Sequence, residues 1–294
     1  MKTFGLILKS FRIKQWSKNL LVFAGILFSQ NIFDAHKLSL VLIAFAVFCL
    51  LSSSAYIFND LVDIEKDKLH PEKSLRPLAS GGLNKNTALF AALFLLITAI
   101  TASFFTGLSL FAAVLSYALL QVFYSFYLKN VVILDVFAIS AGFIIRCIAG
   151  AVVINVEISH WLILCTLLLS LFLGFSKRRH EIVLLESLST GHRKVLEKYK
   201  TYMLDIYMAI LASATILSYA LYTISAETIA KFATKNLIFT TPFVIYGIFR
   251  YLYLVHVENK GGSPESILIE DMPTIFNILL WVFVTALIIY IPKS

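Results

Sequence analysis

The stretch LSLVLIAFAVFCLLSSSAYIF, residues 38–58, decides the fold class. It carries no charged side chain and has the length of about 20 residues that a helix needs to cross roughly 30 Å of hydrocarbon. The whole chain agrees with it, because 59% of its 294 residues are hydrophobic and only 14% are charged, which is far from the usual make-up of soluble domains. The sequence therefore predicts an all-α integral membrane protein.

Apolar runs of similar length recur along the chain without a Pro/Gly/Ser-rich linker between them. The first run is short, so we expect a tilted or partly interfacial helix there. We therefore expect one transmembrane domain over residues 1–294, with two long polar loops at about 59–86 and 177–202. The runs predict about nine transmembrane helices, at 20–34, 38–58, 87–106, 108–128, 132–154, 158–176, 203–224, 236–256 and 273–291.

The basic residues predict the orientation of the chain. Most of them lie before the first span, at the end of the fourth span and in the two long loops, and these segments share one side if the spans alternate. The opposite loops carry only Lys37, Lys231 and Lys235. Because cytoplasmic loops are enriched in Lys and Arg, we expect a multi-pass protein of the cell (inner) membrane with a cytoplasmic N-terminus. No small-residue cleavage site follows the brief apolar segment before Trp16, so we expect no cleaved signal peptide.

The net charge of +8 predicts partners that carry phosphate. The basic residues flank membrane spans and form no nucleic-acid-binding module, so we expect anionic lipid headgroups and phosphorylated substrates, and no nucleic acid. The three cysteines, Cys49, Cys147 and Cys165, fall inside expected spans without metal-ligand spacing. We interpret them as small buried apolar residues.

Three oxygen-bearing side chains recur every four residues where the second span ends: Asn59, Asp63 and Asp67. On a helix this spacing advances about 40° per step, so the three form a stripe along one face. Mg²⁺ prefers carboxylate and amide oxygens, keeps several waters and is often shared with substrate phosphates. We therefore expect these residues to bind Mg²⁺. The alternative, a solvated loop of balanced charge, does not require a four-residue repeat.

This motif resembles a known family. Asn59-Asp60-x-x-Asp63-x-x-x-Asp67 is similar to the first aspartate-rich motif of the UbiA superfamily of intramembrane prenyltransferases, whose nine-helix layout with cytoplasmic active-site loops agrees with the expected spans. Within it, the chain resembles the decaprenyl-phosphate phosphoribosyltransferase branch from about residue 11 to residue 285. The segments that carry this closer resemblance are Arg12 to Asn19, Tyr56 to Gly81 and Ile145 to Gly150.

The second long loop departs from the pattern of typical prenyltransferases. They carry another aspartate pair there, whereas this chain reads SKRRHE at residues 176–181. Lys and Arg bind phosphate oxygens directly through charge-assisted hydrogen bonds, so we expect a site with more phosphate and fewer metal ions. For Arg179 and His180 the alternative is that they only anchor the loop on the cytoplasmic side and take no part in catalysis. The phosphoribosyltransferase branch has a Lys-Arg pair followed by Glu here, which matches Lys177, Arg178 and Glu181.

The resemblance implies transfer of a 5-phosphoribosyl group from phosphoribosyl pyrophosphate to a polyprenyl (decaprenyl-like) phosphate, as in cell wall biosynthesis, with release of pyrophosphate. Mg²⁺ on Asn59 and Asp63 would serve as Lewis acid, with Asp67 as a further ligand or orienting residue. Asp63, Lys73 and Lys177 are the expected catalytic residues. The residues expected to bind substrate are Lys14, Lys18, Tyr56, Lys73, Arg76, Tyr124, Lys129, Arg146, Lys177, Arg178 and Glu181.

Several of these basic residues have a structural alternative. Lys129 ends the fourth span beside tyrosines, as a snorkelling lysine in an aromatic belt would. Arg146 lies inside the fifth span, where a guanidinium needs an anion, either a lipid phosphate or a structural carboxylate. Lys14 and Lys18 flank Trp16, which fits an interfacial amphipathic helix as well as a phosphate clamp.

Two other functions compete with phosphoribosyl transfer. A UbiA-type prenyltransferase would move a prenyl group from a prenyl diphosphate to an aromatic or glycerophosphate acceptor, and the missing second aspartate pair counts against it. A lipid or phosphometabolite transporter would need more polar midplane positions and broken helices. The prenyl chain length, the exact sugar donor, the downstream pathway and homo-oligomerisation are left open.

Overall fold

The computed structural model describes residues 2–69, 72–186, 199–258, 260, 262 and 264–290. Every regular element in these ranges is a helix, and eight segments are long and apolar enough to cross a membrane, so the predicted all-α membrane fold is confirmed. The expected orientation of the N-terminus stays a prediction. The eight segments are α3 (Ala35–Val62), α5 (Lys85–Thr106), α6 (Leu108–Phe126) with η3 (Leu128–Asn130), α7 (Leu134–Val152), α8 (His160–Glu186), α9 (Thr201–Ile224), η5 (Asn236–Thr240) with α11 (Thr241–His256), and α13 (Met272–Tyr290).

The segment 20–34 differs from the expected first span. The chain starts with α1 (Lys2–Ser10) and continues as a 3-10 helix, η1 (Ile13–Phe23), and a single short helix, α2 (Ala24–Phe28). The apolar run then ends at Ser29, Gln30 and Asn31. Gln30 adopts a positive φ of 61°, and the Asn31 amide donates to the Ser29 carbonyl at 2.9 Å. The run is too short to cross the bilayer as one helix.

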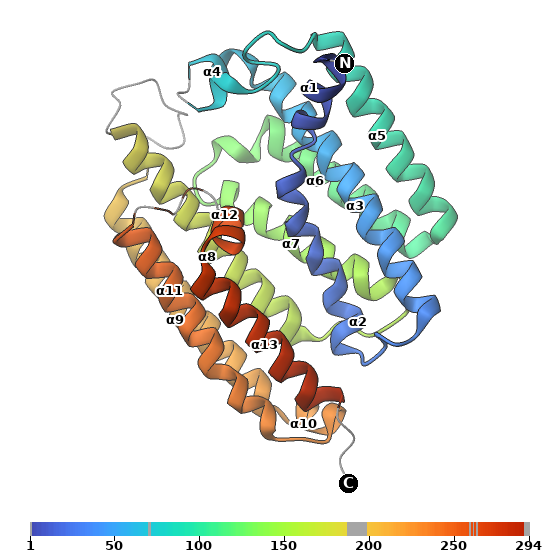
Figure 1. Ribbon diagram of the computed structural model, residues 1–294, viewed down its shortest axis with the longest axis vertical. Coiled ribbons are helices and arrows are strands. Elements are labelled where there is room, and N and C mark those ends of the chain that lie inside the picture. The colour runs from blue at the N-terminus through green and yellow to red at the C-terminus, as the bar shows by residue number, and fades with distance from the viewer. Residues whose placement is uncertain are drawn as a thin grey trace. The chain divides into compact units, whose positions relative to one another are not determined.

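The chain forms two compact units, one of residues up to Ile158 and one of residues from Ser159 onward among those described. In the first unit α3 packs on α5, α6 on α7, and η1 on both α3 and α7. In the second unit α8 packs on α9 and α11 on α13 (Figure 1). Joint action of the units as one catalytic domain stays a prediction. The shorter helices are α4 (Ile64–Lys68) and η2 (Lys73–Leu75) in the first unit and α10 (Ala226–Phe232) and α12 (Pro264–Glu270) in the second.

Local sequence sets the ends of the long helices in the first unit. Asp34 caps α3, because its carboxylate accepts the backbone N–H groups of His36 and Lys37 at 3.0 and 3.1 Å. Such caps satisfy donors that the first turn of a helix leaves unpaired. Gly107 separates α5 from α6 with a φ of 155°, and a residue without a side chain adopts that backbone conformation readily.

A backbone contact fixes the N-terminal segment against α7. A Cβ atom on Gly150 would lie 1.8 Å from the carbonyl oxygen of Val22, and one on Gly25 would lie 2.9 Å from the Cα atom of Ala151. Only glycine permits approaches this close. The two glycines therefore let η1 and α2 lie directly on α7, which carries Arg146.

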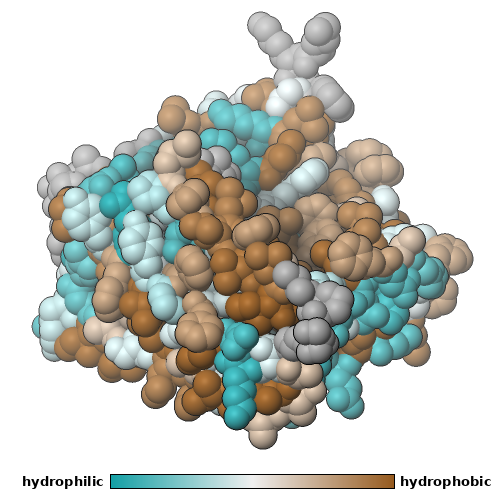
Figure 2. All heavy atoms as spheres, turned by 60° about the horizontal axis from the view of Figure 1, so that its bottom comes forward, coloured by the Kyte–Doolittle hydropathy of each residue, from teal (hydrophilic) through white to brown (hydrophobic). Residues whose placement is uncertain are grey.

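Large apolar side chains cover much of the protein surface. Phe90, Phe105 and Phe276 are 74%, 83% and 66% exposed, and hydrophobic residues dominate much of the face shown in Figure 2. Exposed patches of this kind mark surfaces that contact another apolar phase. In the first unit the buried acids Asp60, Asp63 and Asp67 lie at and just beyond the end of α3, where the candidate site lies.

Candidate active site

Asn59 and Asp63 lie one helical turn apart where α3 ends. The Asp63 N–H donates to the Asn59 carbonyl at 3.0 Å, so the two side chains stay on one face although α3 ends at Val62. The Lys129 ammonium, from η3, donates to both Asp63 carboxylate oxygens at 2.8 Å and to the Asn59 Oδ1 atom at 3.3 Å. Asp63 and Lys129 are buried. Two predicted metal ligands therefore converge on one point, which a cation of the protein occupies.

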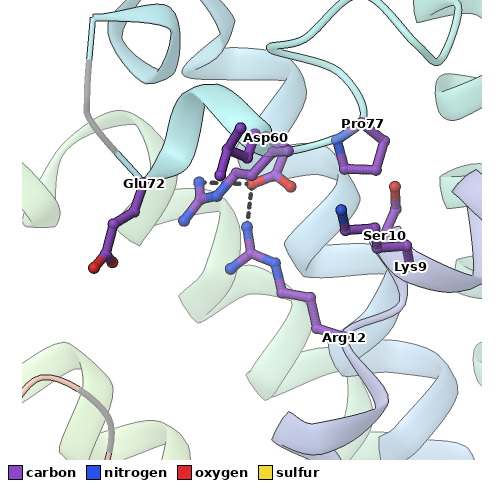
Figure 3. Close-up of a pocket in the computed structure, with 8 residues that line it drawn as sticks. Lys9, Ser10, Arg12, Asp60, Glu72 and Pro77 are labelled. Atoms are coloured by element: carbon purple, nitrogen blue, oxygen red, sulfur yellow. Dashed lines mark hydrogen bonds and ion pairs between the residues drawn. The ribbon is translucent and has the colours of Figure 1, made fainter.

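The third predicted ligand, Asp67, faces a different cation. Its Oδ2 atom accepts from the Arg76 Nη1 atom at 2.6 Å, and Arg76 also donates to Asp60 at 3.0 Å. Arg12 forms a second ion pair with Asp60. Figure 3 shows the Asp60 carboxylate between the two guanidinium groups. The sequence alone suggests no role for Asp60 or Arg12, although both lie in segments that carry the family resemblance.

A pocket of about 220 Å³ opens beside this second cluster. The side chains of Arg12 and Arg76 are 25% and 24% exposed while Asp60 is buried, so both arginine side chains are partly accessible. Arg12 has a φ of 52°, which is unusual for a residue other than glycine and is often associated with functional positions. Its guanidinium lies 5.1 Å from the centre of the Tyr56 ring. The pocket is lined by Lys9, Ser10, Arg12, Asp60, Glu72, Leu75, Arg76 and Pro77 (Figure 3).

The donor set at Asn59 and Asp63 fits a hard divalent cation. Both side chains offer oxygen, and a magnesium ion takes few protein ligands because it retains waters and substrate phosphate. Their oxygens already converge on one point, the Lys129 ammonium, as the ligands of a single metal ion would. No group of three or more His, Cys, Asp or Glu side chains forms a metal cluster among the residues that the structure describes. The fit therefore rests on the Asn59 and Asp63 pair, with Asp67 turned toward Arg76.

Arg146 is buried deep in the first unit among neutral oxygen atoms. Its Nε atom donates to Asn19 Oδ1 at 2.7 Å, Nη1 to the Gly142 carbonyl at 2.7 Å, and Nη2 to the Tyr117 hydroxyl at 2.8 Å. The guanidinium also lies 4.6 Å from the centre of the Tyr117 ring. Asn19 is itself held by Ser52, to which its amide donates at 3.2 Å. No carboxylate pairs with Arg146 in the described part of the chain, and the expected contact with a lipid phosphate stays a prediction.

The segment around Trp16 lies along α3. The Trp16 indole N–H donates to the Ser53 hydroxyl at 3.0 Å, Lys14 is exposed, and the Lys18 ammonium contacts the Gln15 side chain. The tryptophan therefore fixes this segment to the helix that ends in Asn59. Both functions proposed for the two lysines, an interfacial anchor and a phosphate clamp, stay predictions.

The basic cluster of the second unit lies on a helix, whereas the sequence predicted a loop from residue 177 onward. α8 continues through it to Glu186, because residues 177–186 contain no proline or glycine to end the helix. Arg178 is buried and donates to Glu181, one turn later. Lys177 is half-buried. Glu181 therefore holds the Arg178 guanidinium, and its expected contact with substrate stays a prediction.

Two further predicted residues, Lys73 and Tyr124, are half-buried in the first unit. Lys73 begins η2, and Tyr124 lies in the last turns of α6, close in sequence to Lys129. Substrate contacts of these two residues stay predictions.

Asp271 forms a bidentate ion pair that connects two helices of the second unit. Arg250, on α11, donates to its two carboxylate oxygens at 3.1 and 2.7 Å. Thr274, in the first turn of α13, donates through its hydroxyl at 2.6 Å and through its backbone N–H at 3.0 Å. The Arg250 guanidinium, and then the Thr274 donors, hold the pKa of the Asp271 carboxyl well below its usual range. Asp271 is thus ionised at neutral pH and caps α13.

Comparison with known proteins places the chain in a family. Residues 20–267 match the UbiA prenyltransferase family. Decaprenyl-phosphate phosphoribosyltransferase of Corynebacterium glutamicum is 35% identical over 290 residues, covering 97% of this chain and 87% of that protein. The enzyme of the same name from Mycolicibacterium smegmatis is 33% identical over 296 residues, covering 97% and 92%.

A solved structure shares the fold. The structure of a UbiA homolog from Archaeoglobus fulgidus bound to GPP and Mg²⁺ superposes with a TM-score of 0.71 at 17% identity, covering 97% of this chain and all of that one. The family match covers most of the sequence, and the two relatives exceed 30% identity over nearly its full length. The protein is therefore a multi-pass membrane protein that belongs to the UbiA prenyltransferase family.

Proposed function

We propose that this protein transfers a 5-phosphoribosyl group from phosphoribosyl pyrophosphate to a polyprenyl phosphate, with release of pyrophosphate. The observation that carries the proposal is the 35% identity, over 97% of the chain, to an enzyme named decaprenyl-phosphate phosphoribosyltransferase. The basic sequence at residues 176–181 supports it, because a second aspartate pair would be expected of a typical prenyltransferase.

The reaction needs little covalent chemistry from the protein. An oxygen of the lipid phosphate attacks C1 of the sugar, the bond from C1 to the pyrophosphate oxygen breaks, and the configuration at C1 is inverted. The attacking oxygen is already anionic, so no strong general base is needed. Catalysis then rests on positioning the two substrates and on stabilising the charge that grows on the leaving pyrophosphate.

The residues of the first unit supply both requirements. Asn59 and Asp63 would hold Mg²⁺, which would act as Lewis acid on the pyrophosphate. Arg76 and Lys73 bind phosphate oxygens of the donor, with Arg76 oriented by its ion pairs to Asp60 and Asp67. This arrangement gives Asp67 the orienting role rather than that of a direct ligand.

The acceptor phosphate binds to Lys129 and Arg146. Tyr56 and Tyr124 lie in the same unit and border the apolar path of the prenyl chain. Lys177 and Arg178 of the second unit bind donor phosphate oxygens, with Arg178 held by Glu181. The active site lies on the cytoplasmic side of the cell membrane, as the distribution of basic residues predicts.

The test is a membrane assay with labelled phosphoribosyl pyrophosphate, a polyprenyl phosphate and Mg²⁺, in which label is followed into the organic phase. We expect lipid labelling that EDTA and Asp63→Ala abolish. Glu65→Ala is the matched control, because Glu65 is an acid two residues away with a side chain that is 77% exposed. Activity on a prenyl diphosphate with an aromatic acceptor, and no lipid labelling, would replace the proposal by prenyl transfer.

A further inference from the structure

The Lys129 ammonium is bound as a metal ion would be. It contacts three oxygen atoms, two of Asp63 at 2.8 Å and one of Asn59 at 3.3 Å, and its side chain is only 2% exposed. Lysine ammonium groups are strongly hydrated and costly to bury unless they are paired. The buried position is therefore stabilised by the same oxygens that converge as ligands for a divalent cation.

The ammonium and a metal ion cannot share these oxygens. A magnesium ion held by Asn59 and Asp63 would need the same oxygens at about 2.0–2.1 Å, which would leave these oxygens no place for the ammonium nitrogen that now lies 2.8 Å from the carboxylate. Two cations that contact the same oxygens would lie close together and repel strongly in a buried site. One of them must leave before the other can bind.

We propose that Lys129 occupies the divalent-cation position when the metal is absent, and that metal binding displaces its ammonium toward the acceptor phosphate. The lysine has a flexible four-carbon stem with three donors, so it can change partner while η3 stays in place. The exchange keeps Asp63 neutralised in both states. It also makes the Lys129 ammonium available to the acceptor phosphate only after the metal has bound.

The second part of this proposal, in which the displaced ammonium binds the lipid phosphate, rests on the proposed function. It makes the two ligands cooperative, because the metal frees the group that binds the lipid. Such coupling is reciprocal, so the lipid phosphate must tighten metal binding by the same factor. The metal and the acceptor would then bind together more tightly than either does alone.

A second lysine provides a matched control. Lys66 also approaches Asp63, with its ammonium 3.9 Å from the Oδ1 atom, but its side chain is 63% exposed. An exposed pair at this distance contributes little. Removal of Lys66 tests the general effect of deleting a positive charge near the site, whereas removal of Lys129 tests displacement.

The first experiment measures Mn²⁺ binding to the purified protein in detergent by electron paramagnetic resonance, with Mn²⁺ as the only ligand. We expect Lys129→Met to lower the Kd at least tenfold, because the metal no longer has to break charge-assisted hydrogen bonds, and Lys66→Met to change it less than twofold. An unchanged or higher Kd in Lys129→Met would overturn the proposal. The absence of Mn²⁺ binding in the wild type would overturn it together with the metal site.

A second experiment uses the wild-type chain and so does not depend on how a variant folds. An amine-acylating reagent is applied with and without Mg²⁺, and the modification of each lysine is read by mass spectrometry. We expect Mg²⁺ to raise the labelling of Lys129 at least threefold and to leave Lys66 unchanged. Equal labelling of Lys129 in both conditions would contradict displacement.

The lipid arm repeats the Mn²⁺ titration with a polyprenyl monophosphate in the micelles. We expect at least threefold tighter Mn²⁺ binding in the wild type and no change in Lys129→Met. Loss of the lipid effect alone would overturn only the coupling. None of these measurements follows sugar transfer, so a protein that exchanges Lys129 for metal but does not label lipid would refute the proposed function and not the exchange.

Discussion

Replacement of Asp63 by Asn is expected to destabilise the metal-free protein as well as to inactivate it. The Asp63 and Lys129 side chains are 4% and 2% exposed, so the substitution leaves the buried ammonium facing a neutral amide in place of a carboxylate. Breaking one partner of a buried ion pair costs about 3–5 kcal/mol. At about 2–3 °C for each kcal/mol in a chain of this size, the Tm should fall by roughly 6–15 °C.

The same reasoning predicts a rescue of stability without a rescue of activity. In the double variant Asp63→Asn/Lys129→Met both charges are gone, so most of the lost stability should return. The measurement is a double-mutant cycle of thermal unfolding in detergent with EDTA present, because EDTA keeps Lys129 in place. Phosphoribosyl transfer is assayed in parallel and should be at least about 10²-fold reduced in every variant that lacks Asp63, as for loss of other strong electrostatic contacts at developing charge.

An additive cycle would refute the argument. If the two single substitutions lower the Tm by amounts that simply sum in the double variant, the coupling energy is below about 0.5 kcal/mol, and Lys129 does not pair with Asp63. Restored transfer in the double variant would refute the role of Asp63 as a metal ligand.

Three other outcomes are expected. Tyr117→Phe leaves one Arg146 donor without an acceptor, so stability should fall by about 1–3 kcal/mol, whereas Tyr127→Phe, at a side chain that is 73% exposed, should leave the Tm unchanged. Lys177→Ala should raise the KM for phosphoribosyl pyrophosphate by roughly tenfold or more and the KM for the lipid much less; equal effects would make Lys177 a membrane anchor only. Asp271→Asn should lower the Tm by an amount that is constant from about pH 8 to pH 5 and shrinks below about pH 4. A carboxyl whose pKa is lowered by folding stabilises the protein above its unfolded pKa of about 3.9, and this stability is lost as the pH falls through the folded pKa. A Tm difference that stays constant in acid would contradict this.

The fold was predictable where the sequence has long runs without charge. In a run such as 38–58 the backbone N–H and C=O groups find no water in the bilayer, so the run must form a helix in which they bond to one another. Eight such segments are present in the described residues. The expected first span at 20–34 is not one long helix, because the polar residues Ser29 to Asn31 end the apolar run and the segment is divided between η1, α2 and a turn. The continuation of α8 past Ser176 is not predicted by hydropathy, because a charged stretch can form the last turns of a helix as readily as a loop.

The site was predictable where its residues are local in sequence. Asn59 and Asp63 share a face through the four-residue repeat, which is a property of helix geometry. Their partner Lys129 lies 66 residues after Asp63, and no sequence pattern predicts the contact between Lys129 and Asp63. The left-handed backbone of Arg12, which directs its guanidinium to Asp60, is equally invisible, because arginine has no preference for that conformation.

The buried guanidinium of Arg146 has a consequence for how the protein is made. An arginine near the centre of a helix adds about 2.5–3.5 kcal/mol to the free energy of its insertion into the bilayer. Two of its acceptors, Asn19 and Tyr117, precede it in the chain, so they have already left the ribosome when α7 reaches the membrane. The guanidinium can pass from water directly onto oxygens of the growing protein. A chain without η1 would still encode all eight long helices, yet α7 would enter the membrane without Asn19. The N-terminal segment therefore assists the insertion of a helix more than a hundred residues later.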